Sequence, residues 1–83
     1  SYQTIRPVSI DALVVDGNDN PITGATVQIK DTQNTNIIFQ QVSNSNGRVT
    51  GSLSLNTTET TIYIYVVYNG QTTPAKAVAI RSE

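Results

Sequence analysis

Alternation of apolar side chains with a period of two is the feature that most constrains the fold of this chain. It is clearest over Thr61–Tyr68, where aliphatic residues alternate with tyrosines, and it recurs in several other segments. A period of two is that of a β-strand, in which successive side chains point to opposite faces. The side chains on one face of a helix recur with a longer period, about 3.6 residues. Val, Ile and Thr contribute 30 of the 83 residues, and these β-branched side chains favour strands. The inward-facing set predicted from the alternation is Val8, Ile10, Ala12, Val14, Val27, Ile29, Leu53, Leu55, Ile62, Ile64 and Val66.

Turn sequences separate the alternating segments. Residues 16–21, 31–36, 43–47 and 69–70 are rich in Asn, Asp, Ser, Thr and Gly. Two Asn-Gly pairs predict tight hairpin turns with positive φ at Gly47 and Gly70. The predicted fold is therefore all-β without a helix, an immunoglobulin-like β-sandwich of about seven antiparallel strands that forms one domain over residues 1–83.

The N-terminal region carries three further expectations. Leu13 and Val15 add apolar groups to the second face of the strand over residues 8–15, which predicts a central strand covered on both faces. Because proline lacks the N–H of a strand ladder, Pro7 predicts a break that makes residues 1–7 a separate N-terminal strand extension. With an odd number of strands, the two chain ends are expected at opposite poles of the sandwich.

Composition narrows the classes of function. The chain contains no His and no Cys, and no carboxylate pair has the spacing of an acid/base couple, so we expect a non-enzyme without metal or cofactor. Its five Lys and Arg residues are dispersed, which argues against nucleic acid as a partner. No apolar run has the length of a membrane span, so we expect no membrane insertion by this segment. A chain rich in Thr and Asn but poor in Lys and Glu is typical of extracellular structural proteins, which predicts an extracellular or cell-surface location.

Three motifs resemble those of a known family. The run DGNDNPITGATV from Asp16 to Val27, the turn SNGRV from Ser45 to Val49 and the hairpin VVYNGQ from Val66 to Gln71 are similar to bacterial immunoglobulin-like domains of the invasin/intimin type. Carboxypeptidase regulatory-like and prealbumin-like sandwiches share the first two motifs, and the final hairpin favours the invasin type. The resemblance spans residues 8 to 80 and implies an extracellular spacer or adhesive module. In such a module Ile22 would plug one end of the sandwich.

The alternating residues Asp16, Asn18 and Asn20 have the spacing that opens a calcium-binding loop of the EF-hand type. That loop needs a glycine after the third ligand and a glutamate six residues later, and Pro21 stands at the glycine position. An Asx-rich turn is therefore the preferred interpretation. A separate motif, Asn56-Thr57-Thr58, is an N-glycosylation sequon in a predicted exposed loop, so Asn56 is a candidate glycosylation site.

Aromatic and N-terminal residues give the candidate interface. If Ile62 and Ile64 face the core, Tyr63 and Tyr65 form a stripe on the outer face of their strand, either as ordinary sheet surface or as a contact surface. Tyr2 and Ile5 lie in the N-terminal segment, which is expected to pair with its own domain or with the next copy.

These observations favour a non-catalytic extracellular structural or adhesive module of a cell-surface protein, with protein partners or self-association. Two alternatives remain open at the level of sequence. One is a self-assembling subunit of an extracellular filament linked by strand exchange. The other is a carbohydrate-binding module that uses its surface tyrosines as stacking platforms.

Overall fold

Seven β-strands and no helix make up the part of the chain that the computed structural model describes, residues 5–56 and 61–79. The strands are β1 (Ile5–Leu13), β2 (Thr26–Lys30), β3 (Ile37–Val42), β4 (Arg48–Asn56), β5 (Thr61–Tyr68), β6 (Gln71–Thr72) and β7 (Lys76–Ala79). All strand pairs are antiparallel. The predicted all-β fold of seven antiparallel strands is confirmed.

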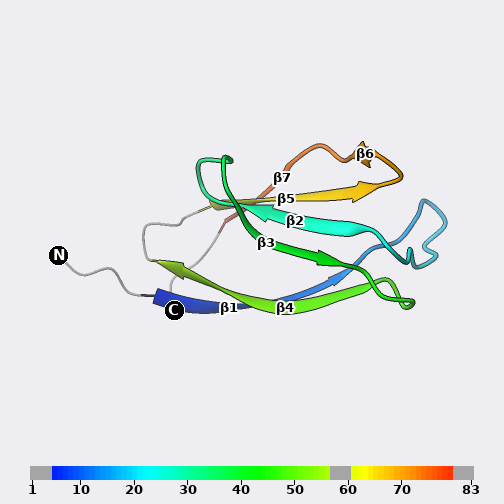
Figure 1. Cartoon of the computed structure of the whole chain (residues 1–83), viewed down its shortest axis with the longest axis horizontal. Helices are drawn as coiled ribbons and strands as arrows, with labels where there is room; N and C mark the ends of the chain where they lie inside the picture. Colours follow the sequence, from blue (N-terminus) through cyan, green and yellow to red (C-terminus); the bar gives the residue numbers. More distant parts are fainter. Residues whose placement is uncertain (1–4, 57–60, 80–83) are drawn as a thin grey trace.

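The strands form two layers of unequal width. One sheet contains only β1 and β4, and the other has the order β3-β2-β5-β6, with β7 also paired to β5. The two short strands β6 and β7 follow one another along the same side of β5, because β6 pairs with Val67 and Tyr68 and β7 pairs with Thr61–Ile64. Figure 1 shows the two layers stacked face to face, which is the arrangement of a β-sandwich.

The core lies between the layers, and the alternation identified it correctly. Six of the predicted inward-facing residues are buried and the other five are half-buried and pack against them. Ala25 and Val49 are also fully buried, and Phe39 packs against both halves of the core. The buried members of the predicted set are Val14, Val27, Ile29, Leu53, Leu55 and Ile62.

One polar side chain is buried within this core. The Ser43 hydroxyl donates a hydrogen bond to the Ile22 carbonyl oxygen at 2.6 Å and accepts one from the Ala25 N–H at 3.0 Å. The backbone of Ser43 also pairs with Ala25 and Gly24. These bonds satisfy the hydroxyl and fasten the β1–β2 connection to the end of β3.

The prediction that β1 is a central strand covered on both faces is wrong. Among the described strands it pairs with β4 alone, and the side chains of Leu13 and Val15 are 53% and 37% exposed. The two apolar groups on the second face therefore mark an uncovered surface rather than a buried one.

The predicted strand break at Pro7 is also wrong, because Pro7 lies within β1 and pairs with Ser54 of β4. Val14 donates its N–H to the Gly47 carbonyl oxygen at 2.8 Å, on the β4 side. Since N–H groups alternate in direction along a strand, those of even-numbered residues point towards β4 and those of odd-numbered residues point away. Pro7 thus lacks an N–H only on the open edge, where the ladder does not need it. Ile5 and Arg6 pair with the domain's own β4, as one of the two expected arrangements requires.

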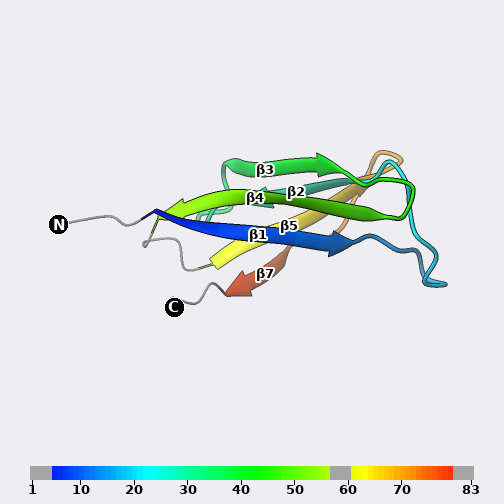
Figure 2. The ribbon, with the colours of Figure 1, turned by 90° about the horizontal axis from the view of Figure 1, so that it is seen from below.

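The start of β1 and the end of β7 do not lie at opposite poles, contrary to the expectation for the chain ends. Ile5 pairs with Asn56 at the end of β4, and Ala79 pairs with Thr61 at the start of β5. Only residues 57–60 connect Asn56 to Thr61, so β1 begins and β7 ends at the same pole, as Figures 1 and 2 both show. The prediction from the odd number of strands was wrong because β6 and β7 share one side of β5 and together occupy the place of one interrupted strand.

The predicted positive φ of the two turn glycines is confirmed. Asn69 and Gly70 have φ values of 52° and 75°, the combination of a two-residue type I′ hairpin. Gly47 has a φ of 75°, but the predicted tight hairpin at this turn is wrong, because β3 and β4 belong to different sheets. The turn is instead closed by Asn44, whose carbonyl oxygen accepts the Gly47 N–H at 2.9 Å and whose Oδ1 accepts the Arg48 N–H at 3.0 Å.

Candidate functional site

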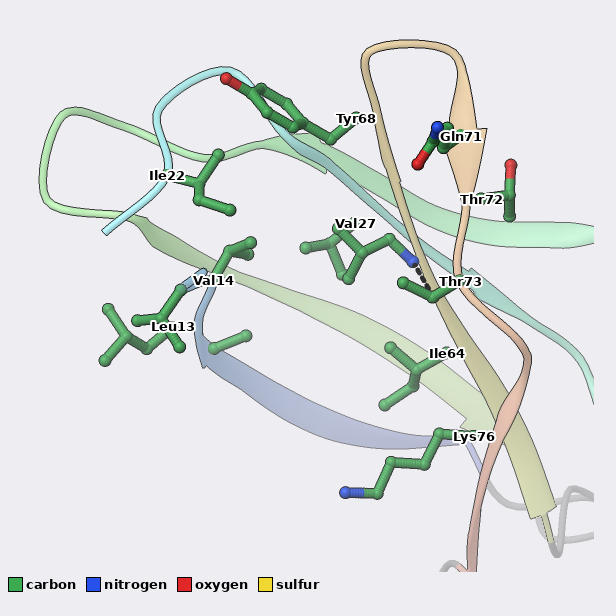
Figure 3. A pocket seen from close by; sticks show the side chains of 13 residues that line it. Leu13, Val14, Ile22, Val27, Ile64, Tyr68, Gln71, Thr72, Thr73 and Lys76 are labelled. Atoms are coloured by element: carbon green, nitrogen blue, oxygen red, sulfur yellow. Dashed lines mark hydrogen bonds between the residues drawn. The ribbon is translucent and has the colours of Figure 1, made fainter. Parts of the chain in front are cut away.

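An apolar groove opens between the end of β1 and the β5–β7 side of the wider sheet. Its volume is about 690 Å³. Figure 3 shows Val14, Val27 and Ile64 pointing into the space between the layers, with Thr73 and Lys76 on the strand segment opposite β1. The described residues that line it are Ala12, Leu13, Val14, Val15, Ile22, Val27, Ile64, Val66, Tyr68, Gln71, Thr72, Thr73 and Lys76.

The groove exists because the narrow sheet does not cover the whole of the wider one. Ile64 and Val66 belong to β5, which has neighbours on both sides, yet both side chains remain only half-buried. Tyr68, at the end of β5, is 41% exposed. The apolar inner face of the wider sheet therefore extends beyond β1 and meets solvent there.

Polar groups line only the rim of the groove. Thr73 Oγ1 accepts the Val66 N–H at 3.0 Å, which holds the β6–β7 connection against β5. Lys76 is the only charged residue in the lining, and no ion pair joins it to a described residue. The site therefore suits an apolar or uncharged occupant, and Lys76 provides a single positive charge at one end.

The predicted tyrosine stripe lies on the opposite, outer face of the wider sheet. Tyr63 and Tyr65 pair with Lys30 and Gln28 of β2, and both rings are half-buried. Tyr65 donates its hydroxyl hydrogen to Asn34 Oδ1 at 2.7 Å, and the Lys30 Nζ lies 5.0 Å from the centre of its ring. Neighbouring amides also pair, since Gln28 Nε2 donates to Gln40 Oε1 at 2.9 Å.

This geometry separates Tyr68 from the other two tyrosines. Residues of β5 alternate between faces, so Tyr68 lies on the inner side with Ile64 and Val66, while Tyr63 and Tyr65 face outwards. The two rings that sequence grouped as an interface lie on an outer surface, and the groove lies across the sheet from them. Lys30 lies on the same outer face as these two rings and packs over the Tyr65 ring.

Asp16 closes the turn that resembles the start of a calcium loop. Its Oδ1 accepts the N–H groups of Asn18 at 2.8 Å and Asn20 at 3.0 Å, which confirms an Asx-type turn. The hydrogen bonds from the backbone of Asn20 and then of Asn18 lower the pKa of Asp16 below its ordinary value. No group of three or more carboxylates that could hold a metal ion occurs among residues 5–56 and 61–79.

Asp31 organises the β2–β3 loop in the same way. The backbone N–H of Thr35 donates to Asp31 Oδ1 at 3.0 Å, and the side chain of Asn36 donates to Oδ2 at 3.1 Å. The hydrogen bond from the Thr35 backbone is the main cause that lowers the pKa of the Asp31 carboxyl, and desolvation opposes it. Asn34 has a φ of 58° in this loop, the conformation from which it accepts the Tyr65 hydroxyl.

Two of the remaining predicted site residues, Ile5 and Asn56, lie at the pole where β1 begins. Ile5 begins β1 and pairs with Asn56, which ends β4 and so belongs to a strand rather than to the predicted loop. Thr57 and Thr58 of the sequon, and Tyr2, lie outside the described residues. The groove was not predicted from the sequence, although the apolar residues Leu13 and Val15 on the second face of β1 were a signal for it.

Comparison of the chain with protein-family models, curated proteins and solved structures gives no match. The described strands and loops include no helix with the length and hydrophobicity that crossing a membrane requires.

Proposed function

We propose that this chain is a non-catalytic structural or adhesive module of a cell-surface protein, with an immunoglobulin-like sandwich as its scaffold. The observation that carries the proposal is that the start of β1 and the end of β7 lie at one pole of the domain, whereas three of its connections lie at the opposite pole. The chain enters β1 and leaves β7 at one pole. The β1–β2 connection, the β3–β4 turn and the β5–β6 turn all lie at the other pole (Figure 1).

This arrangement of the two poles suits a module that is attached to its parent protein at one pole and presents the loops of the other pole to a partner. The presented pole carries the open end of the groove, since Leu13, Ile22 and Tyr68 are all close to its turns. Its connections are rigidly held by the buried Ser43 hydroxyl and by the Asp16 and Asn44 turns. Loops on a rigid scaffold are where binding residues commonly lie. Because both ends are at one pole, the domain is better suited to display than to act as one link of a linear tandem spacer.

The location and the displayed pole can both be tested. An antibody raised against the folded domain should label intact, unpermeabilised cells of the source organism. Labelling that requires permeabilisation would contradict the surface location. If the domain displays this pole, attaching it to a fluorescent bead through its chain ends should leave its binding to the target surface intact. The substitution Ile22→Asp, at the displayed pole, should weaken that binding. Thr61→Asp, at the attachment pole, serves as the control that should bind normally.

Carbohydrate binding on the tyrosine face is a second candidate. Amide side chains of Asn34, Gln28 and Gln40 surround Tyr65, and amides beside an aromatic ring can hydrogen-bond sugar hydroxyls while the ring stacks. Lys30 already covers part of the Tyr65 ring, which leaves less of it for stacking. A glycan array decides the matter: specific binding that is lost in Tyr65→Ala and retained in Tyr68→Ala, on the other face, would support it.

A further inference from the structure

Strand β3 forms an edge of the wider sheet that no charged side chain of its own protects. Among the described strands it pairs with β2 alone. Its sequence, IIFQQV, contains no Lys, Arg, Asp, Glu, Gly or Pro, whereas natural proteins commonly blunt an open edge with charges or proline. The side chains of Ile37 and Val42 on this strand are 50% and 57% exposed. The edge of β3 is therefore open to solvent and neutral along its whole length.

The other edges of the two described sheets carry features that hinder pairing. Strand β1 contains Arg6, Pro7 and Asp11. On the far side of the wider sheet, β6 and β7 are separate short strands, and β7 begins with Lys76. Strand β4 begins with Arg48 and lies nearer the middle of the molecule in Figure 2, where β3 is the outermost strand on its side. A strand of another molecule can therefore approach β3 without meeting β4.

The backbone of β3 has two residues whose polar groups point to this open edge. Ser43 donates its N–H to the Ala25 carbonyl oxygen at 2.7 Å, on the β2 side. Because successive residues of a strand alternate in the direction of their N–H and C=O groups, those of Gln40 and Val42 point away from β2. Nothing in the described parts of the chain, residues 5–56 and 61–79, pairs with these outward groups. The register shifts at the start of β3, so the regular ladder covers Phe39–Val42.

This edge is complementary to itself. If two copies meet about a two-fold axis beside Gln41, Gln40 of each copy lies opposite Val42 of the other, and each such pair exchanges both backbone hydrogen bonds. Gln41 then lies opposite Gln41 of the second copy in the closer, non-hydrogen-bonded kind of pair. Its side-chain amide has no hydrogen-bond partner among the described residues. An amide both donates and accepts, so it can pair with its own copy, whereas a charged side chain in this place would repel itself.

We propose that β3 pairs with β3 of a second copy, antiparallel about a two-fold axis at Gln41, and so joins two wide sheets into one. The paired stretch, Phe39–Ser43, is short and buries less than the roughly 1,200 Å² of a standard interface, so the dimer is weak and depends on concentration. Antiparallel pairing places the poles where β1 begins at opposite ends of the dimer, which suits a contact between two facing surfaces. This last consequence rests on the proposed surface role, whereas the pairing itself does not, and its failure would leave antibody labelling of intact cells unaffected.

Cross-linking through a single introduced cysteine tests the register. The chain contains no cysteine, so Gln41→Cys supplies its only thiol. In the proposed pair the two Cα atoms lie about 4.5 Å apart, within the range of about 4.4–6.8 Å that a disulfide spans. Mild oxidation of Gln41→Cys should therefore give a disulfide-linked dimer that reducing agent dissolves. Gln40→Cys, also exposed on β3, is the matched control, because the two positions become diagonal neighbours about 7–8 Å apart and should cross-link much more slowly.

Sedimentation equilibrium of the unaltered chain, at concentrations up to about 1 mM, tests the association itself. The weight-average mass should rise from the 8.9 kDa of one chain towards twice that value and no further, because a two-fold contact closes on itself. Val42→Lys places like charges beside the axis and should keep the mass at that of one chain. Leu13→Lys, at a residue of similar exposure on β1, is the control that should dimerise normally.

Four results would overturn the proposal. The first is an unaltered chain that stays monomeric throughout, and the second is a mass that rises well beyond that of two chains. The third is dimerisation that survives Val42→Lys or is lost in Leu13→Lys, since either would place the contact on another surface. The fourth is cross-linking of Gln40→Cys as fast as that of Gln41→Cys, which would exclude the register.

Discussion

Gly47 is the residue at which a single methyl group should destabilise this domain most sharply. Its φ of 75° lies in the left-handed region, where a side chain costs about 1–2 kcal/mol. A Cβ at this position would also lie 2.6 Å from the Val14 carbonyl oxygen and 3.0 Å from the Pro21 Cβ. Both neighbours belong to the backbone or to a proline ring, so they cannot move aside as the tip of a long side chain could.

The contact involves hydrogen bonds that join the β1–β2 connection to the β3–β4 turn. Val14 donates to the Gly47 carbonyl at 2.8 Å and accepts from the Ile22 N–H at 3.0 Å. Displacing Val14 strains or breaks these bonds, each worth about 0.5–1.5 kcal/mol. The conformational cost and the weakened hydrogen bonds together should make Gly47→Ala lower the free energy of unfolding by about 2–4 kcal/mol. The stiffer unfolded chain of the variant offsets about 0.4–1 kcal/mol of this loss.

Gly70 provides the matched control. It has the same φ of 75°, but a Cβ there would meet no atom within 4 Å. Gly70→Ala should therefore cost only the left-handed conformation, about 1 kcal/mol after the unfolded-state offset. Urea unfolding of both variants measures the difference, which isolates the contact with Val14 and Pro21. Equal destabilisation of the two variants would refute the steric argument and leave backbone conformation as the only effect.

Three further predictions concern the core, the buried hydroxyl and the loop carboxylates. Ile29→Ala should lower the free energy of unfolding by about 2–5 kcal/mol, and Ile64→Ala by less, because Ile29 is fully buried while Ile64 borders the groove. Urea unfolding measures both values, and a larger loss for Ile64→Ala than for Ile29→Ala would mean that the groove is closed in solution. Ser43→Ala should cost about 1–3 kcal/mol, because it leaves the Ala25 N–H and the Ile22 carbonyl unpaired inside the domain; Ser45→Ala, on the exposed turn, is the control that should be nearly neutral. Because the pKa values of Asp16 and Asp31 are lowered from 3.8, their stabilisation is complete above that pH and is lost as the pH falls through the lower folded values. Thermal melts between pH 2 and about 5 should thus depend less on pH in the Asp16→Asn and Asp31→Asn variants than in the unaltered chain, and unchanged pH dependence would contradict the assignment.

Several features of this domain could be read from local sequence. The inward-facing residues followed from alternation alone, because a strand's period of two fixes the face of every side chain once one is buried. The left-handed glycines of both turns followed from Asn-Gly pairs, since few other residues tolerate that conformation. The Asx turn at Asp16 followed in the same way from short polar residues spaced to accept nearby N–H groups.

The candidate site could not be read in this way, because it depends on which strands become neighbours. Alternation specifies the faces of a strand but not what lies along its edges, so Leu13 and Val15 looked like the second buried face of a central strand. Pro7 looked like a break because the sequence does not show which edge its missing N–H would occupy; the Val14–Gly47 hydrogen bond assigns it to the open edge. The placement of β6 and β7 along one side of β5 brings the start of β1 and the end of β7 to one pole and makes the wide sheet extend past β1. Face patterns are set by local side-chain geometry, whereas edges, poles and the groove arise only when distant strands pair and one sheet remains narrower than the other.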